Sequence, residues 1–193
     1  MPRAFVAVLL DEQTRRTVTA QIDRLRPLSK IVAWVPPHNL HLTLRFLGDQ
    51  TEEQLAEVVP ALEEAAVGVP TFTLSLKGLC AFPGLDHPRT LWVGVSDGVE
   101  EVRRLQARVA EALQRRGTPI EPRAWLAHVT IGRVTDERRW RREGMPELRS
   151  AVTRGSTVPF GSMPVTSIAL MRSDLYTSGA RYTGIASVPL SSG

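Results

Sequence analysis

The sequence contains one cysteine, Cys80, and this scarcity excludes both a disulfide scaffold and a cysteine-based metal cluster. A chain without disulfides is typical of a reducing compartment, so we expect a cytoplasmic protein. No apolar run approaches the roughly 18–20 residues that a membrane-spanning helix needs. The N-terminal apolar stretch runs directly into Asp11 without a small-residue cleavage site, which indicates a first strand and not a signal peptide. We therefore expect no membrane partner.

Lysine is also scarce: Lys30 and Lys77 are the only two lysines. Arginine supplies the remaining strongly basic side chains. Arginine suits phosphate, since its planar guanidinium donates two parallel hydrogen bonds. A genome-level preference for arginine codons explains the composition equally well. The net charge of +4 therefore supports a polyanionic partner only weakly.

Several motifs of common enzyme classes are missing. There is no Walker-type lysine loop and no Gly-x-Gly-x-x-Gly, so triphosphate and dinucleotide binding lack their usual phosphate cradle. There is no Gly-x-Ser-x-Gly elbow of the kind that serine hydrolases use. His38 and His41 have His-x-x-His spacing but no nearby carboxylate as a third ligand, and His87 lies in a turn-like segment. We expect neither a metal nor a cofactor.

The sequence does contain two similar strand-like segments, each with a histidine and a threonine two residues apart. Residues 41–48 alternate apolar and polar side chains, which is the pattern of a half-buried strand. Side chains two apart on a strand share a face, so His41 and Thr43 should project side by side. The same pair returns as His128 and Thr130 in the second half of the chain. One such pair is a weak signal, but two copies argue against chance.

The elements around these segments follow the same order in both halves, which predicts an internal duplication. In each half a strand (residues 3–10 and 90–95) is followed by an amphipathic helix and then by a histidine-containing strand. No low-complexity linker separates the halves. We therefore expect residues 1–193 to form a single domain with two lobes, approximately 1–88 and 89–193.

Two histidine strands that meet at the centre of the fold would place two imidazoles and two hydroxyls in one cleft. Histidine exchanges protons near neutrality, so one neutral and one protonated imidazole could act as base and acid. Thr43 and Thr130 could donate hydrogen bonds to phosphate oxygens. Arg133, five residues after His128, could bring a guanidinium to the same phosphate. This set suits metal-free in-line displacement at phosphorus, although sequence symmetry does not say which histidine is the acid.

These residues resemble the two-histidine phosphoesterase superfamily, and more closely its bacterial and archaeal branch of RNA 2′,3′-cyclic phosphodiesterases, historically called 2′-5′ RNA ligases. The resemblance extends over nearly the whole chain. The matching segments are residues 3–7, 34–36, 41–48, 81–83, 91–95, 128–133, 179–182 and 189–190. Ala127 departs from the family pattern, which usually has proline before the second histidine; this affects how stiffly the strand begins and not the chemistry.

The resemblance implies an α+β fold built as a bilobal pseudo-twofold duplication, with two mainly antiparallel sheets flanking a central cleft and helices outside. It implies metal-independent hydrolysis of a terminal RNA 2′,3′-cyclic phosphate to a 2′-phosphate, without a cofactor and with reversible 2′-5′ RNA ligation as a side or reverse reaction. It also implies that His41 donates a proton and His128 accepts one, while Thr43, Thr130 and Arg133 hold the phosphate.

Phe46 lies where the family tends to offer an aromatic face to a base or to the cleft wall, although core packing explains this residue at least as well. Two other functions remain open: a nucleoside 2′,3′-cyclic phosphodiesterase acting on small substrates, and a non-catalytic RNA-binding module. A pure binding module needs no acid–base pair, which argues against the second. The expected partner is RNA with a 2′,3′-cyclic phosphate end, and no obligate protein partner is evident.

Overall fold

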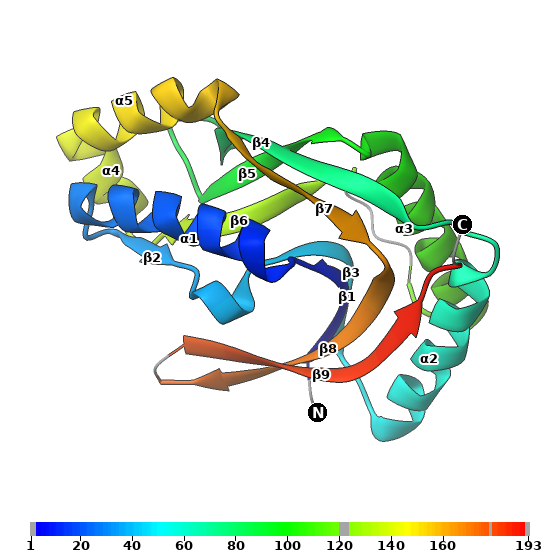
Figure 1. Ribbon diagram of the computed structural model, residues 1–193. Helices are drawn as coiled ribbons and strands as arrows, with labels where there is room; N and C mark the ends of the chain where they lie inside the picture. The colour runs from blue at the N-terminus through cyan, green and yellow to red at the C-terminus, as the bar shows by residue number, and fades with distance from the viewer. Residues whose placement is uncertain (1–2, 120–123, 178, 192–193) are drawn as a thin grey trace.

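The computed structural model describes residues 3–119, 124–177 and 179–191, which Figure 1 shows as ribbon. The strands are β1 (Arg3–Leu9), β2 (Val32–Trp34), β3 (His41–Asp49), β4 (Phe72–Phe82), β5 (Thr90–Asp97), β6 (His128–Val134), β7 (Pro159–Val165), β8 (Ser167–Tyr176) and β9 (Gly179–Pro189). The helices are α1 (Glu12–Leu25), α2 (Glu52–Ala66), α3 (Val99–Arg115), α4 (Glu137–Glu143) and α5 (Pro146–Arg154), and the 3-10 turn η2 (Pro37–Asn39) precedes β3. No helix in these residues is both long and apolar enough to cross a membrane.

Amphipathic helices cover one face of the sheet. The carboxylate of Asp11 begins α1, because it accepts a hydrogen bond of 2.8 Å from the otherwise unpaired backbone N–H of Thr14. The spacing of apolar residues at i, i+3 or i+4 and i+7 gives each helix one buried stripe. These stripes comprise Val18, Ile22 and Leu25 of α1, and Val102, Leu105, Val109 and Leu113 of α3. Figure 1 shows α2 and α3 side by side on the outside of the sheet.

All of the long strands belong to one antiparallel sheet, in the order β7-β4-β5-β6-β3-β1-β8-β9, with β2 paired to β6. The two histidine strands, β3 and β6, are therefore neighbours at its centre. We call the strands β3, β1, β8 and β9 the His41 wing, and the strands β6, β5, β4, β7 and β2 the His128 wing.

The α+β class is confirmed, but the two separate sheets that we expected form one continuous sheet. The wings join where β3 and β6 pair at Leu42 and Val129, both of which are completely buried. Two unjoined sheets would leave strand edges with unpaired backbone groups inside the core, which costs free energy. The main-chain pairing at this point removes that cost.

The wings do not follow the predicted halves of the chain. β4 precedes residue 88 but pairs with β5 and β7 in the His128 wing. β8 and β9 come from the C-terminal part of the chain but extend the His41 wing next to β1. A boundary near residue 88 therefore does not divide the fold. The internal duplication stays a prediction, although the orders β1-α1-β3 and β5-α3-β6 place equivalent elements on both sides of the junction.

Gly132 allows β2 to lie close to β6. A Cβ atom at this position would lie 2.7 Å from Val32 Cγ1 and 3.1 Å from the nearest ring atom of Trp34. We expect Gly132→Ala to destabilise the protein by about 1–3 kcal/mol, the usual cost of overpacking. Urea unfolding would measure the change. Gly84→Ala is the matched control, because a Cβ there meets no atom within 4 Å, and equal unfolding midpoints for the two variants would contradict the prediction.

Candidate active site

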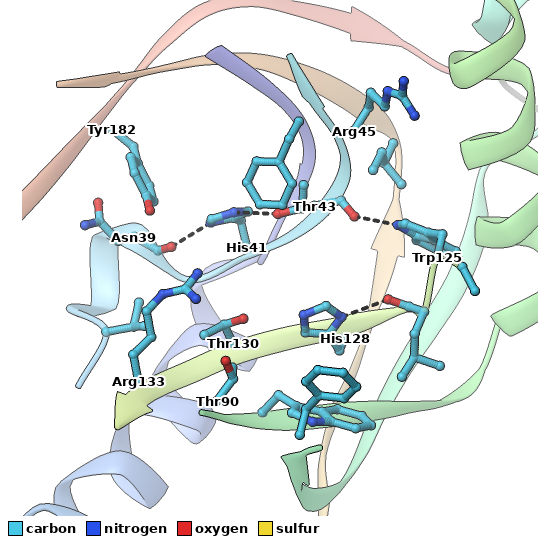
Figure 2. Close-up of a pocket in the computed structure, with 17 residues that line it drawn as sticks. Asn39, His41, Thr43, Arg45, Thr90, Trp125, His128, Thr130, Arg133 and Tyr182 are labelled. Atoms are coloured by element: carbon cyan, nitrogen blue, oxygen red, sulfur yellow. Dashed lines mark hydrogen bonds between the residues drawn. The ribbon is translucent and has the colours of Figure 1, made fainter. Parts of the chain in front are cut away.

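A cleft of about 330 Å³ lies between the two wings, lined by side chains from both histidine strands (Figure 2). It brings together every site residue named from the sequence: His41, Thr43, Phe46, His128, Thr130 and Arg133. His38 and His87 are exposed and are not among its lining residues. No three His, Cys, Asp or Glu side chains converge as a metal site anywhere in the described part of the chain.

A β-bulge in each histidine strand determines which later side chains reach the cleft. Ala7 of β1 pairs with Thr43, and the neighbouring Val6 pairs with Arg45. Leu44 of β3 therefore has no partner in β1 and is an extra residue. In the same way, Trp92 of β5 pairs with Thr130 and the neighbouring Leu91 pairs with Gly132, so Ile131 of β6 is an extra residue. An extra residue shifts the alternation of side chains by one and turns the following residues to the other face.

The two bulges make Phe46 and Arg133 equivalent, since each lies five residues after a histidine and turns toward the cleft. Both strands show the same burial pattern from the histidine onward, with two consecutive buried residues and then an exposed one. The unbroken alternation expected for residues 41–48 is therefore wrong beyond Leu44. Arg45 turns inward, where it is 7 % exposed and donates a hydrogen bond to the carbonyl oxygen of Pro119, whereas Phe46 is 58 % exposed.

Both histidines are held in the same tautomer by backbone carbonyl groups. Nδ1 of His41 lies 2.7 Å from the carbonyl oxygen of Asn39, and Nδ1 of His128 lies 2.8 Å from that of Leu126. A carbonyl oxygen only accepts, so Nδ1 carries the hydrogen in each ring. Nε2 is then the atom that exchanges a proton, and in His41 it lies 2.9 Å from Oγ1 of Thr43.

The surroundings of the two imidazoles differ. The His41 ring lies between Phe5 and Tyr182, with centroid separations of 4.6 and 5.3 Å. Burial lowers the pKa of His41 below 6.5; the hydrogen bond to the Asn39 carbonyl opposes this effect, and the charges of His128 and Arg133 add to it. The free cleft therefore favours neutral His41.

The turn that orients His41 is anchored to a distant strand. Asn39 is 4 % exposed, and its Nδ2 donates a hydrogen bond of 2.7 Å to the carbonyl oxygen of Ala180 in β9. Because the carbonyl group of the same Asn39 accepts from His41, β9 helps to fix the imidazole. Tyr182, two residues further along β9, contacts that imidazole directly. The β8–β9 hairpin is thus part of the candidate site.

Arg133 supplies positive charge to the cleft. Figure 2 shows its guanidinium directed toward the space that His41 and Thr130 also face. No carboxylate in the described part of the chain forms an ion pair with it. A guanidinium that projects into a cleft without an internal carboxylate is suited to binding an anion such as phosphate.

Sequence reasoning missed several residues that line the cleft or support it. Thr90 and Trp92 come from β5, and Nε1 of Trp125 donates a hydrogen bond of 3.0 Å to the carbonyl oxygen of Thr43. Trp92 and Tyr182 fall within matching segments of the family resemblance, which was their only signal. For Thr90 and Trp125 the sequence offers none, because their positions depend on contacts between distant elements.

Comparisons with known proteins agree with this geometry. A model of the 2′-5′ RNA ligase superfamily matches residues 14–177. The RNA 2′,3′-cyclic phosphodiesterase of Aquifex aeolicus is 36 % identical over 94 % of this chain and 93 % of that protein, and the one of Archaeoglobus fulgidus is 36 % identical over 93 % and 96 %. A crystal structure from Thermus thermophilus has a TM-score of 0.81 at 27 % identity over 98 % of both chains. E. coli LigT complexed with 3′-AMP has the same fold, with a TM-score of 0.77 at 23 % identity over 99 % of both chains.

We expect the buried His41 imidazole to titrate below 6.5 in the free protein. Inorganic phosphate should raise this pKa, because a bound anion offsets the charges of Arg133 and His128. NMR titration of the imidazole protons would measure both values, with a His41→Asn variant to assign the signal. A midpoint at or above 6.5 without phosphate would contradict the prediction.

Proposed function

Because the chain belongs to the 2′-5′ RNA ligase superfamily, we propose that it hydrolyses terminal RNA 2′,3′-cyclic phosphates to 2′-phosphates. It is an enzyme, an RNA 2′,3′-cyclic phosphodiesterase like the relatives that it matches over most of its length. The proposed hydrolysis to a 2′-phosphate rests on one observation: two histidines of the same tautomer lie in one cleft, each with Nε2 left to exchange a proton.

In the proposed reaction, Thr43, Thr130 and Arg133 hold the non-bridging oxygens of the cyclic phosphate. Nε2 of His128 takes a proton from water as the water oxygen forms a bond to phosphorus. The bond from phosphorus to the 3′ oxygen breaks, and that oxygen takes a proton from Nε2 of His41. The product keeps its phosphate on the 2′ oxygen. Each proton transfer is worth roughly 10²- to 10⁴-fold in rate.

The lowered pKa of His41 is compatible with its role as the proton donor. The pKa is lowered by burial and by the charges of His128 and Arg133, and a bound phosphodiester monoanion offsets the charge effects. Substrate binding therefore favours the protonated imidazole that the leaving oxygen requires. Above the pKa of His41 in the free protein, kcat/KM should decline as the donor loses its proton.

Phe46 is proposed to bind the base of the terminal nucleotide. Its ring is 58 % exposed and lines the cleft on the His41 wing, so it is not a core residue. Stacking of a base on an aromatic side chain is worth about 1–3 kcal/mol and tolerates any base. The platform would therefore give affinity without sequence specificity.

The same site would catalyse 2′-5′ ligation when a 5′-hydroxyl replaces water. Attack by that oxygen with departure of the 3′ oxygen leaves a 2′-5′ phosphodiester. Water is present in large excess, so hydrolysis should dominate.

We expect activity to be independent of metal ions. An oligonucleotide with a 2′,3′-cyclic phosphate end, incubated with the enzyme in excess EDTA, should yield the 2′-phosphate. Chromatography against 2′- and 3′-phosphate standards identifies the product, and His128→Ala serves as the inactive control. Loss of activity in EDTA that zinc or manganese restores would refute the two-histidine mechanism.

A sulfur substitution separates the roles of the two histidines. A thiol has a pKa of about 8.5, so a 3′-sulfur leaving group needs far less protonation than an alcohol. His41→Ala should be impaired roughly 10²- to 10⁴-fold on the oxygen substrate and largely restored on the 3′-thio cyclic substrate. His128→Ala should be impaired on both. Restoration of His128→Ala by sulfur would reverse the assignment, and restoration of neither variant would mean that the histidines transfer no protons.

A further inference from the structure

The cleft has a second exposed aromatic side chain that the hydrolytic reaction does not use. Phe82, the last residue of β4, is 61 % exposed and lines the cleft from the His128 wing. A cyclic phosphate end brings one terminal base to the cleft, and Phe46 on the opposite wing provides a platform for it. Large aromatic side chains are usually buried, so an exposed ring inside a nucleotide cleft indicates a second binding surface.

The register of the sheet places Phe82 on the same side of the cleft as His128. Phe82 pairs with Thr90 of β5, and Thr90 pairs with Arg133 of β6, so these three side chains share one face of the sheet. In the next row, Trp92 pairs with Thr130, and the Trp92 ring lies edge-on to His128 with a centroid separation of 5.6 Å. Phe82 and Trp92 therefore extend an aromatic surface outward from His128.

The position of the nucleophile connects this surface with chemistry. In the proposed reaction the attacking group gives its proton to Nε2 of His128, so the attacking group must lie beside His128. A water molecule needs no further contacts there. A nucleoside that attacks through its 5′-hydroxyl carries a base, and that base must rest on the surface next to His128.

We propose that Phe82, beside Trp92, forms the stacking platform for the nucleoside whose 5′-hydroxyl attacks the cyclic phosphate in the ligation direction. This proposal rests on the proposed function, since it takes His128 as the base. The 5′ oxygen forms a bond to phosphorus while its proton moves to Nε2 of His128. The bond to the 3′ oxygen breaks, and that oxygen takes the proton of His41. The product is a 2′-5′ phosphodiester.

The test measures how the cyclic phosphate is divided between two acceptors. An oligonucleotide with a 2′,3′-cyclic phosphate end is incubated with rising concentrations of 2′,3′-dideoxyadenosine, whose only hydroxyl is the 5′ group. Chromatography gives the ratio of the oligonucleotide joined 2′-5′ to dideoxyadenosine to the oligonucleotide 2′-phosphate. For wild-type protein this ratio should rise and then saturate. Phe82→Ala should lower it about fivefold or more, as expected for the loss of one base–aromatic stack, whereas Phe82→Trp should preserve it.

Two control variants show whether the effect belongs to Phe82. Val67→Ala removes an apolar side chain that is 69 % exposed at the end of α2 and does not line the cleft, so rate and ratio should both be kept. Phe46→Ala should slow the formation of both products and keep their ratio.

The outcomes separate this proposal from the proposed function. If wild-type protein forms neither product, the proposed function fails. If it forms the 2′-phosphate but no saturable amount of ligated product, or if Phe82→Ala keeps the wild-type ratio, the acceptor platform is refuted while hydrolysis stands.

Discussion

The pairing of Leu42 with Val129 is the contact on which the whole site depends. These two apolar residues are completely buried, and each stands between a histidine and a threonine. Because side chains alternate along a strand, burying the middle residue turns the histidine and the threonine to the open side. The hydrophobic effect that closes the core therefore also places two imidazoles and two hydroxyls in one cleft. No polar attraction between these imidazoles and hydroxyls is needed to assemble them.

The alternation of side chains explains four of the site residues that the sequence predicts, and the bulges explain the other two. His41, Thr43, His128 and Thr130 follow from the period of a strand. Arg133 does not, because residues five apart on a regular strand face opposite sides. The bulges arise where β3 pairs with β1 and where β6 pairs with β5, and nothing in the amino-acid sequence of β3 or β6 specifies that pairing. Phe46 was ambiguous for the same reason.

The fold class and the superfamily could be predicted from the sequence, whereas the tertiary arrangement could not. Periodicity located the strands on either side of the junction, and the motifs identified the superfamily. The single sheet, the crossing of strands between wings and the anchoring of Asn39 by β9 all depend on contacts between residues far apart in the chain. Local patterns carry no information about such contacts. The two halves of the chain do not coincide with the two wings, because β4, β8 and β9 pair with strands of the other half or wing.

The crossing of strands between the wings has a consequence for biosynthesis. A ribosome releases β1, α1 and β3 early, but β8 and β9, which complete that wing and anchor the turn before His41, emerge last. The nascent chain therefore cannot complete the cleft that holds His41 and His128 until synthesis of the described fold is almost finished. Until then β1 presents an unpaired edge to the cell, and such edges invite association with other chains. Protection of the early strands, by a chaperone or by rapid translation, would matter more for this topology than for one built from successive halves.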